Sequence, residues 1–248
     1  MSDRPTVAVV TGASRGLGAG LAEAFASRGM ALGLCARTQP PVPKPATAVS
    51  RSVDVTDADA LEAFTDEVVS TLGPIDLWVN NAGVLGPIGP LAEADPAALV
   101  RHLQVNVDGV VHGSRLYARH VRSRPGGGML VNISSGAGST PYQGWAVYGA
   151  SKAAVDMLTE VVATEEAKHG LLAYAVAPGR VNTDMQALIR STSPEDFPAV
   201  DRYHRALVDG DFNPPWWVAD YILGLKDDPT RANGAIRLRV PDRPPGCV

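Results

Sequence analysis

The residues best suited to chemistry lie between positions 134 and 152. Tyr148 and Lys152 are four residues apart, so on a helix they share one face. A phenol with a pKa of about 10 is a poor proton donor or base at neutral pH, and a neighbouring ammonium favours its phenolate. A hydroxyl from Ser134 or Ser135 beside this pair could hold a carbonyl oxygen while the phenol supplies a proton. The spacing therefore indicates carbonyl reduction or alcohol oxidation, provided that a hydride donor lies nearby.

The amino end of the chain has the pattern of a dinucleotide-binding turn. A short apolar run at 7–11 is followed by Gly12, Gly16 and Gly18, and apolar residues then recur at helical spacing. Glycines let the backbone approach phosphates, whose charge lies at the amino terminus of the following helix. The spacing is Gly-x-x-x-Gly-x-Gly, and a purely structural glycine turn is the alternative.

Six groups of residues, in this order, resemble the motifs of the short-chain dehydrogenases/reductases. They are Thr11-Gly12-x-x-x-Gly16-x-Gly18, Asn80-Asn81-Ala82-Gly83, Asn106, Ser135, Tyr148-x-x-x-Lys152 and Pro178-Gly179. The resemblance covers nearly the whole chain. It implies a Rossmann-type fold and a nicotinamide-dependent oxidoreductase.

The resemblance also assigns roles to four candidate catalytic residues. Tyr148 is expected to be the general acid/base, and Lys152 to lower its pKa and hold the nicotinamide ribose. Ser135 fits the substrate-oxygen ligand better than Ser134, and Asn106 is expected to anchor a water that joins the lysine to solvent. Taken singly, each has a simpler interpretation: a surface Tyr–Lys pair, a helix cap, or a helix-interior hydrogen bonder.

Length and composition agree with one α/β domain over residues 1–248. The chain has a formal net charge of −4, which gives no sign of a nucleic-acid surface. Its two cysteines, Cys35 and Cys247, form neither a disulfide framework nor a metal site, so no metal is expected. No apolar run long enough to cross a membrane and no leader segment is evident, so we expect a soluble cytoplasmic enzyme without a membrane partner.

Strands and helices are expected to alternate, which predicts a doubly wound parallel sheet with helices on both faces. Strands are expected at 6–11, 30–36, 48–54, 75–80, 128–133, 171–177 and 234–240, and helices at 17–28, 58–71, 96–123, 147–169 and 215–226. The prolines at 39–45 exclude a helix there. The polar, proline-interrupted segment 184–214 is expected to be a substrate lid.

The second strand indicates the cofactor. NAD enzymes of this kind normally end that strand with a carboxylate for the ribose 2′-hydroxyl, but here Ala36 stands at this position and Arg37 follows. Arg15 adds a second cation, and two guanidiniums suit a 2′-phosphate, which predicts NADP(H). By resemblance, the remaining cofactor contacts are Gly12, Ser14, Gly16, Leu17, Gly18, Asp54, Val55, Asn81, Ala82, Gly83, Tyr148, Lys152, Pro178, Gly179, Val181 and Thr183.

The substrate is expected to be a small carbonyl or alcohol compound. The predicted pocket residues are Ser135, Tyr142, Trp145, Tyr148, Gln186 and Trp216, whose aromatic and amide groups suit a bulky or aromatic ketone. Trp216 and Trp217 could instead pack the last helix against the sheet.

The segment 182–197 is similar to the benzil reductase and sepiapterin reductase branch, whose members reduce one carbonyl of a vicinal dicarbonyl with NADPH. In sepiapterin reductases an acidic residue of the final strand anchors the pterin, and Leu238 aligns with that position here. Asp242 could replace it if the strand shifts. We therefore expect a reductase of benzil-like diketones rather than of pterins.

Two other classes stay open: an oxidative biosynthetic alcohol dehydrogenase and a non-catalytic NADP(H)-sensing protein. The family resemblance also implies a homodimer or homotetramer that assembles through helices 96–123 and 147–169.

Overall fold

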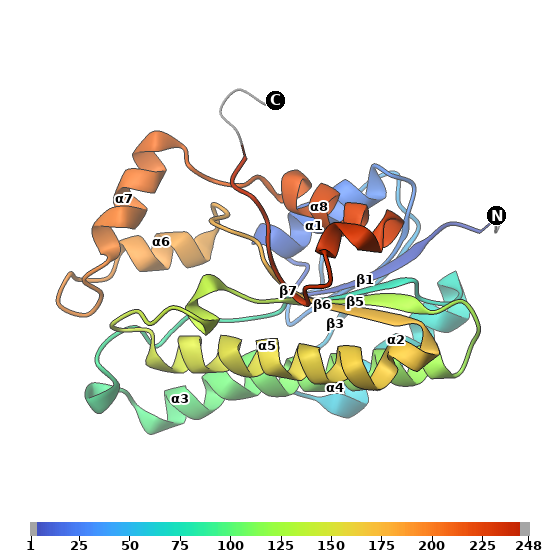
Figure 1. The fold of residues 1–248 in the computed structure, drawn as a ribbon, viewed down its shortest axis with the longest axis horizontal. Coiled ribbons are helices and arrows are strands. Elements are labelled where there is room, and N and C mark those ends of the chain that lie inside the picture. The colour runs from blue at the N-terminus through green and yellow to red at the C-terminus, as the bar shows by residue number, and fades with distance from the viewer. Residues whose placement is uncertain (1–3, 244–248) are drawn as a thin grey trace.

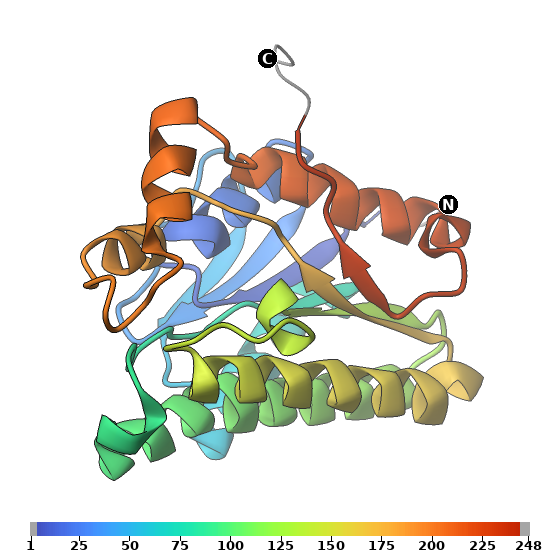
Figure 2. The same cartoon turned by 60° about the vertical axis from the view of Figure 1, so that its left-hand side comes forward.

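The computed structural model describes residues 4–243, and a seven-stranded parallel sheet forms its centre (Figures 1 and 2). The strand order is β3-β2-β1-β4-β5-β6-β7, and each neighbouring pair is parallel. The strands are β1 (Val7–Thr11), β2 (Ala31–Ala36), β3 (Ala48–Ser52), β4 (Leu77–Asn80), β5 (Gly128–Ile133), β6 (Leu171–Ala177) and β7 (Arg237–Arg239). The predicted doubly wound α/β fold is confirmed.

Helices cover both faces of the sheet, with α1 and α8 on one face and α2, α4 and α5 on the other (Figure 1). The α-helices are α1 (Gly16–Ala26), α2 (Ala58–Leu72), α3 (Pro96–Leu103), α4 (Gly109–Arg122), α5 (Ala146–Glu166), α6 (Asp184–Arg190), α7 (Val200–Asp209) and α8 (Pro215–Asp227). The five expected helical segments are all present.

The core consists of two apolar layers, one on each side of the sheet. Every residue of β1, β2 and β4 is buried, as expected for central parallel strands that are covered on both faces. Alternate side chains of β1 enter opposite layers: Val10 packs with Phe25 of α1, whereas Val9 packs with Trp78 and Tyr117.

Three segments differ in detail from the prediction. The expected helix 96–123 is interrupted by a π-helical turn at Gln104–Asp108. The last strand is shorter than expected because Asn233 and Gly234 take positive φ angles of 48° and 77°, which form a turn before β7. Segment 184–214 contains two helices, α6 and α7, while residues 37–47 have no helix, as the prolines predict.

The sheet order reverses between β1 and β4, and this reversal leaves a crevice at the carboxyl ends of the strands. Helices α6 and α7 lie beyond this end of the sheet, apart from the two covering layers (Figures 1 and 2). The fold thus brings the glycine turn after β1, the serines after β5 and the start of α5 to one edge.

Candidate active site

Helix α5 carries Tyr148 in its first turn and Lys152 one turn further on. Both side chains are buried, and the Lys152 Nζ lies 5.8 Å from the centroid of the phenol ring. The Nζ donates a hydrogen bond of 2.8 Å to the carbonyl of Ile133 at the end of β5. Because both residues are buried, the surface-pair interpretation is wrong.

Burial changes the proton affinities of both groups. It lowers the pKa of Lys152 to about 8, although the nearby Asp156 carboxylate opposes the shift. Burial also raises the pKa of Tyr148, and a hydrogen bond with Ser135 opposes this only in part. In this state the pKa of the phenol lies above its usual value, and the lowering by Lys152 that the family resemblance implies stays a prediction.

The two serines after β5 face different partners. The buried Ser134 Oγ donates to the Asp156 carboxylate. Ser135 caps the short turn that follows, where its Oγ accepts from the backbone N–H of Ala137 at 3.2 Å. Since Ser135 also bonds the Tyr148 side chain, it is the serine placed to share a substrate oxygen with the phenol.

Asn106 lies in the π-helical turn and is fully buried. Its side-chain amide bonds both backbone groups of Val84, accepting from the N–H at 2.8 Å and donating to the carbonyl at 2.8 Å. A Cβ built on Gly83 would lie 3.3 Å from the Asn106 Oδ1 and 4.0 Å from the Lys152 Nζ. Asn106 thus fixes the loop after β4 close to the lysine.

His102 is a buried partner of Asn106 that the sequence reading missed. The Asn106 Nδ2 lies 2.9 Å from the His102 Nε2, which is also 3.2 Å from the Ser151 Oγ. The opposite ring nitrogen lies 2.8 Å from the carbonyl of Gly86. Burial lowers the pKa of His102, so a neutral ring with its proton on Nδ1 suits this network. The one available signal was its position four residues before Asn106, on the same helix face.

The glycine turn and the start of α1 form the other half of the site. Thr11 joins the ends of β1 and β4, because its Oγ1 accepts from the backbone N–H groups of Asn81 and Ala82 at 3.0 and 3.1 Å. Gly12 has a φ of +67°, and a Cβ there would lie 2.7 Å from the Ala82 Cα, so a larger residue would not fit. No side chain caps the amino end of α1 and its first turn has no acidic residue. Its backbone N–H groups are thus suited to a phosphate.

A single cavity of about 1030 Å³ joins these two halves. It is lined by most of the sequence-predicted residues, namely Gly12, Ser14, Arg15, Gly16, Leu17, Gly18, Ala36, Arg37, Asp54, Val55, Asn81, Ala82, Gly83, Ser135, Tyr142, Trp145, Tyr148, Lys152, Pro178, Gly179, Val181, Thr183 and Gln186. Asn106 lies behind this lining. The structure thus gathers residues from seven chain segments around one space.

Trp216 is the predicted pocket residue that the structure places elsewhere. It lies on α8, outside the cavity lining, and stacks edge-on against Trp217 at 5.9 Å. The Trp217 Nε1 donates to the carbonyl of Pro241 at 2.9 Å. Trp217 also packs on the apolar layer under α8, as the alternative interpretation expected for both tryptophans, whereas Trp216 is 37% exposed.

Trp145 joins the lid to the proposed proton donor. Its ring stacks on Phe197 at 4.6 Å and meets the Tyr148 ring edge-on at 5.4 Å. Tyr142 and Tyr203 lie 5.1 and 5.8 Å away, so four aromatic side chains surround this indole. Tyr203, Arg180, Arg202 and Arg239 line the cavity as well. The sequence pattern around these four residues does not predict that they line the cavity.

The remaining sequence expectations concern metals, cysteines and membranes. Cys35 is buried in β2, where burial raises the pKa of its thiol to about 12, and Cys247 lies outside the described residues. Within residues 4–243 no group of three His, Cys, Asp or Glu side chains is arranged to hold a metal. None of the helices in that range is both long enough and apolar enough to span a membrane.

Comparison with known proteins agrees with this geometry. The family model described as short chain dehydrogenase matches residues 6–194. The benzil reductase ((S)-benzoin forming) of Bacillus subtilis (strain 168) is 32% identical over 235 residues, which cover 92% of this chain and 96% of the relative. The chain therefore belongs to the short-chain dehydrogenase/reductase family of oxidoreductases, which use nicotinamide cofactors.

Solved structures show the same fold. The crystal structure of the KRED1-Pglu enzyme superposes with a TM-score of 0.80 at 29% identity and covers 94% of this chain and 99% of its own. A short chain dehydrogenase from Burkholderia cenocepacia J2315, solved in complex with NADP, has a TM-score of 0.74 at 27% identity, with coverages of 97% and 90%.

Proposed function

We propose that this protein is an NADPH-dependent carbonyl reductase that acts on one carbonyl of an aryl or vicinal diketone. One observation supports this above all: Tyr148, Ser135 and Lys152 meet at a cavity whose other end is a glycine turn with two arginines. The benzil reductase of Bacillus subtilis, a relative over nearly the full length, supports the substrate class.

The chain fits a bound NADP(H). The uncapped amino end of α1 suits the pyrophosphate, and Arg15 and Arg37 flank the position of the adenosine ribose, where Ala36 offers no carboxylate. Asp184 holds Arg15 at 3.1 Å, whereas Arg37 forms no ion pair within residues 4–243, so Arg37 is the stronger candidate for a 2′-phosphate. When bound, the nicotinamide supplies the hydride.

The side chains of Ser135, Tyr148 and Lys152 bind the substrate oxygen and supply its proton. Ser135 and Tyr148 donate hydrogen bonds to it as negative charge develops, and they do so in a buried site, where such bonds are strongest. Tyr148, neutral because burial raises its pKa, passes its proton to that oxygen. Lys152, with a pKa of about 8, exchanges protons near neutral pH and replaces the phenol proton, with Asn106 holding the path to solvent.

The pocket wall supports an aromatic substrate rather than a pterin. Tyr142, Trp145 and Tyr203 form an aromatic surface next to Tyr148. The acidic candidate Asp242 does not line the cavity, and its carboxylate lies 3.3 Å from Arg239. Segment 184–214 serves as the substrate lid, since residues of both α6 and α7 line the cavity.

We also propose that the enzyme is a homo-oligomer that uses the outer faces of α4 and α5. Three apolar side chains, Val111, Met157 and Val161, are exposed there by 38%, 61% and 44%. Light scattering with the Met157→Glu variant tests this, because a charge in an apolar interface should release monomers.

The function is tested by following NADPH oxidation with benzil, 1-phenyl-1,2-propanedione, a simple aryl ketone and sepiapterin. We expect rapid turnover of the diketones, little with sepiapterin, and a loss of at least about a hundredfold in kcat for Tyr148→Phe. No turnover with any of them, despite tight NADPH binding, would refute the proposal.

A further inference from the structure

The substrate end of the cavity carries an excess of positive charge. Arg180, Arg202 and Arg239 line it, and they come from the loop after β6, from α7 and from β7. The acidic lining residues are Asp54 and Asp184. Asp54 follows β3 and accepts from Thr56, and Asp184 pairs with Arg15, so both belong to the cofactor end.

Two of these arginines have carboxylate partners outside the cavity lining. Arg180 pairs with Asp211, and the Arg239 Nη2 lies 3.3 Å from the Asp242 Oδ1. Arg202 has no ion pair within residues 4–243. The substrate end therefore holds three guanidiniums, two of which have carboxylate partners, and this balance favours a negative ligand.

Strand β7 determines which of its side chains reaches this site. Its register places Leu238 opposite Val176, and Leu238 packs on the apolar layer of α1 and α8. Arg239 lies on the other face of the strand, where its guanidinium comes within 3.9 Å of a Cβ built on Gly136, next to Ser135. A cation thus lies beside the reacting groups, on the strand where pterin reductases carry an anionic anchor.

Two residues of the lining each carry a buried polar atom that has no hydrogen-bond partner within residues 4–243. These atoms are the Trp145 Nε1, whose N–H can only donate, and the Gln186 Oε1, which can only accept. Buried polar groups are rarely left without a partner, so the indole N–H indicates an acceptor oxygen on the ligand. The indole N–H is independent of the arginines and favours an acceptor oxygen, whereas the Gln186 Oε1 calls for a donor.

We propose that the substrate is an aromatic ketone that also carries a carboxylate, an oxo-carboxylate, with Arg202 and Arg239 as its anion-binding residues. This inference rests on the proposed carbonyl reduction at Tyr148. The aromatic side chains around Trp145 hold the aryl group, while the guanidiniums hold the carboxylate. The reduction itself is unchanged: the carbonyl carbon gains a hydride, the oxygen gains a proton from Tyr148, and the carboxylate takes no part.

The test compares each acid with its neutral methyl ester, so that charge is the principal difference. Benzoylformate and 3-benzoylpropionate, each with its ester, are assayed with NADPH, and their binding to the NADP⁺-loaded protein is measured by calorimetry. We expect kcat/KM to favour at least one acid about tenfold, and this preference to fall as salt is added, because both guanidiniums are partly exposed.

Variants test whether Arg202 and Arg239 cause the preference for the acid over its ester. Arg202→Gln and Arg239→Gln should each lower it about three- to fivefold, and Arg202→Lys should keep part of it. Arg205→Gln is the matched control, since Arg205 is exposed on the same helix but does not line the cavity.

The outcomes separate this inference from the proposed function. Equal turnover of acids and esters, unaffected by Arg202→Gln, would overturn the carboxylate assignment and leave the reductase intact. If neither these compounds nor the diketones are reduced, the reductase proposal fails. The carboxylate site then stands if acid binding depends on Arg202 and Arg239, and it falls if binding is absent or indifferent to them.

Discussion

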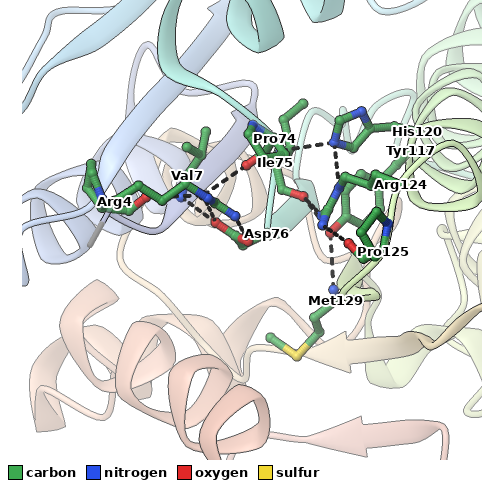
Figure 3. A network of polar contacts seen from close by, with 11 residues as sticks. Arg4, Val7, Pro74, Ile75, Asp76, Tyr117, His120, Arg124, Pro125 and Met129 are labelled. Carbon is green, nitrogen blue, oxygen red and sulfur yellow. Dashed lines mark hydrogen bonds and ion pairs between the residues drawn. The ribbon is translucent and has the colours of Figure 1, made fainter. Parts of the chain in front are cut away.

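His120 is built into the structure as a neutral hydrogen-bond acceptor, which predicts acid sensitivity of the fold. Figure 3 shows its ring, which the last turn of α4 carries, beside Ile75 of the loop before β4 and beside Arg124. The Nε2 accepts from the backbone N–H of Ile75 and from the Nε of Arg124, both at 3.0 Å. A nitrogen that accepts two bonds has no proton of its own, so protonation of His120 would break both contacts and place a cation beside Arg124.

The size of the effect follows from the pKa of His120. Burial first, and then the charge of Arg124, lower it from 6.5 to about 4, with Asp76 opposing. Each pKa unit corresponds to about 1.4 kcal/mol, so the upper limit is about 3.5 kcal/mol. Partial solvent access to the ring reduces this, and we expect a contribution of about 1–2 kcal/mol.

The direction of the pH dependence follows from whether the folded or the unfolded state binds the His120 proton at the higher pH. Between pH 6.5 and about 4 the unfolded chain binds a proton at His120 and the folded chain does not. The contribution is therefore complete above pH 6.5 and is lost as the pH falls toward 4.

Urea unfolding across this range measures the loss, and His120→Gln is the matched variant because an amide oxygen can accept the same bonds without titrating. The free energy of unfolding of the wild type should fall by about 1–2 kcal/mol more than that of the variant between pH 7 and pH 4.5. Parallel pH dependences, or an NMR titration that gives His120 an ordinary pKa, would refute this reasoning.

Three further predictions concern the site. Reduction should slow above pH 8, because Lys152 loses its charge at about that pH, and a pH–rate profile that stays flat to pH 10 would contradict this. His102→Ala should lower kcat about tenfold with little change in the Kd for NADPH, because it removes the support of a buried polar network; His204→Ala, an exposed control on α7, should do neither. Arg37→Gln should weaken NADPH binding about tenfold or more and NADH binding little. Arg15→Gln should have a smaller effect on NADPH binding, because the Arg15 guanidinium is already paired with Asp184. Fluorescence titration measures both affinities, and equal losses for the two cofactors would exclude the 2′-phosphate contact.

Much of the fold could be predicted because its signals are local. Buried parallel strands are continuous apolar runs, as in β1. The turn before α1 needs positive φ angles, which glycine adopts more readily than other residues, so its glycines mark it in the sequence. Prolines at 39–45 excluded a helix, and none formed. The convergence of Ser135 and Tyr148 also follows from topology, since the residues after β5 and the start of α5 meet at one sheet edge.

The site details that were missed depend on contacts across the chain. His102 is one helical turn from Asn106, but its role depends on Gly86 and Ser151, which arrive from other segments. Trp216 looked like a pocket residue by composition, yet α8 turns it toward Trp217 and away from the cavity. Side-chain type alone does not determine which of two faces a residue occupies.

Strand β7 shows how the face that a side chain occupies determines the charge near the site. Successive side chains of a strand point to opposite faces, so a shift of one residue exchanges every contact that the strand makes. In this chain the register places Leu238 in the core, and Arg237 pairs with Glu160 of α5 at 2.7 Å. Arg239, two residues from Arg237 and on the same face, is thereby directed to the cavity. Leu238 aligns with the pterin-anchor position and supplies no carboxylate there, and the register directs the guanidinium of the next residue, Arg239, toward the cavity. The pairing of β6 with β7 therefore adds Arg239 to the positive charge that Arg180 and Arg202 supply from other elements, and together they make a carboxylate-bearing ketone the substrate to test.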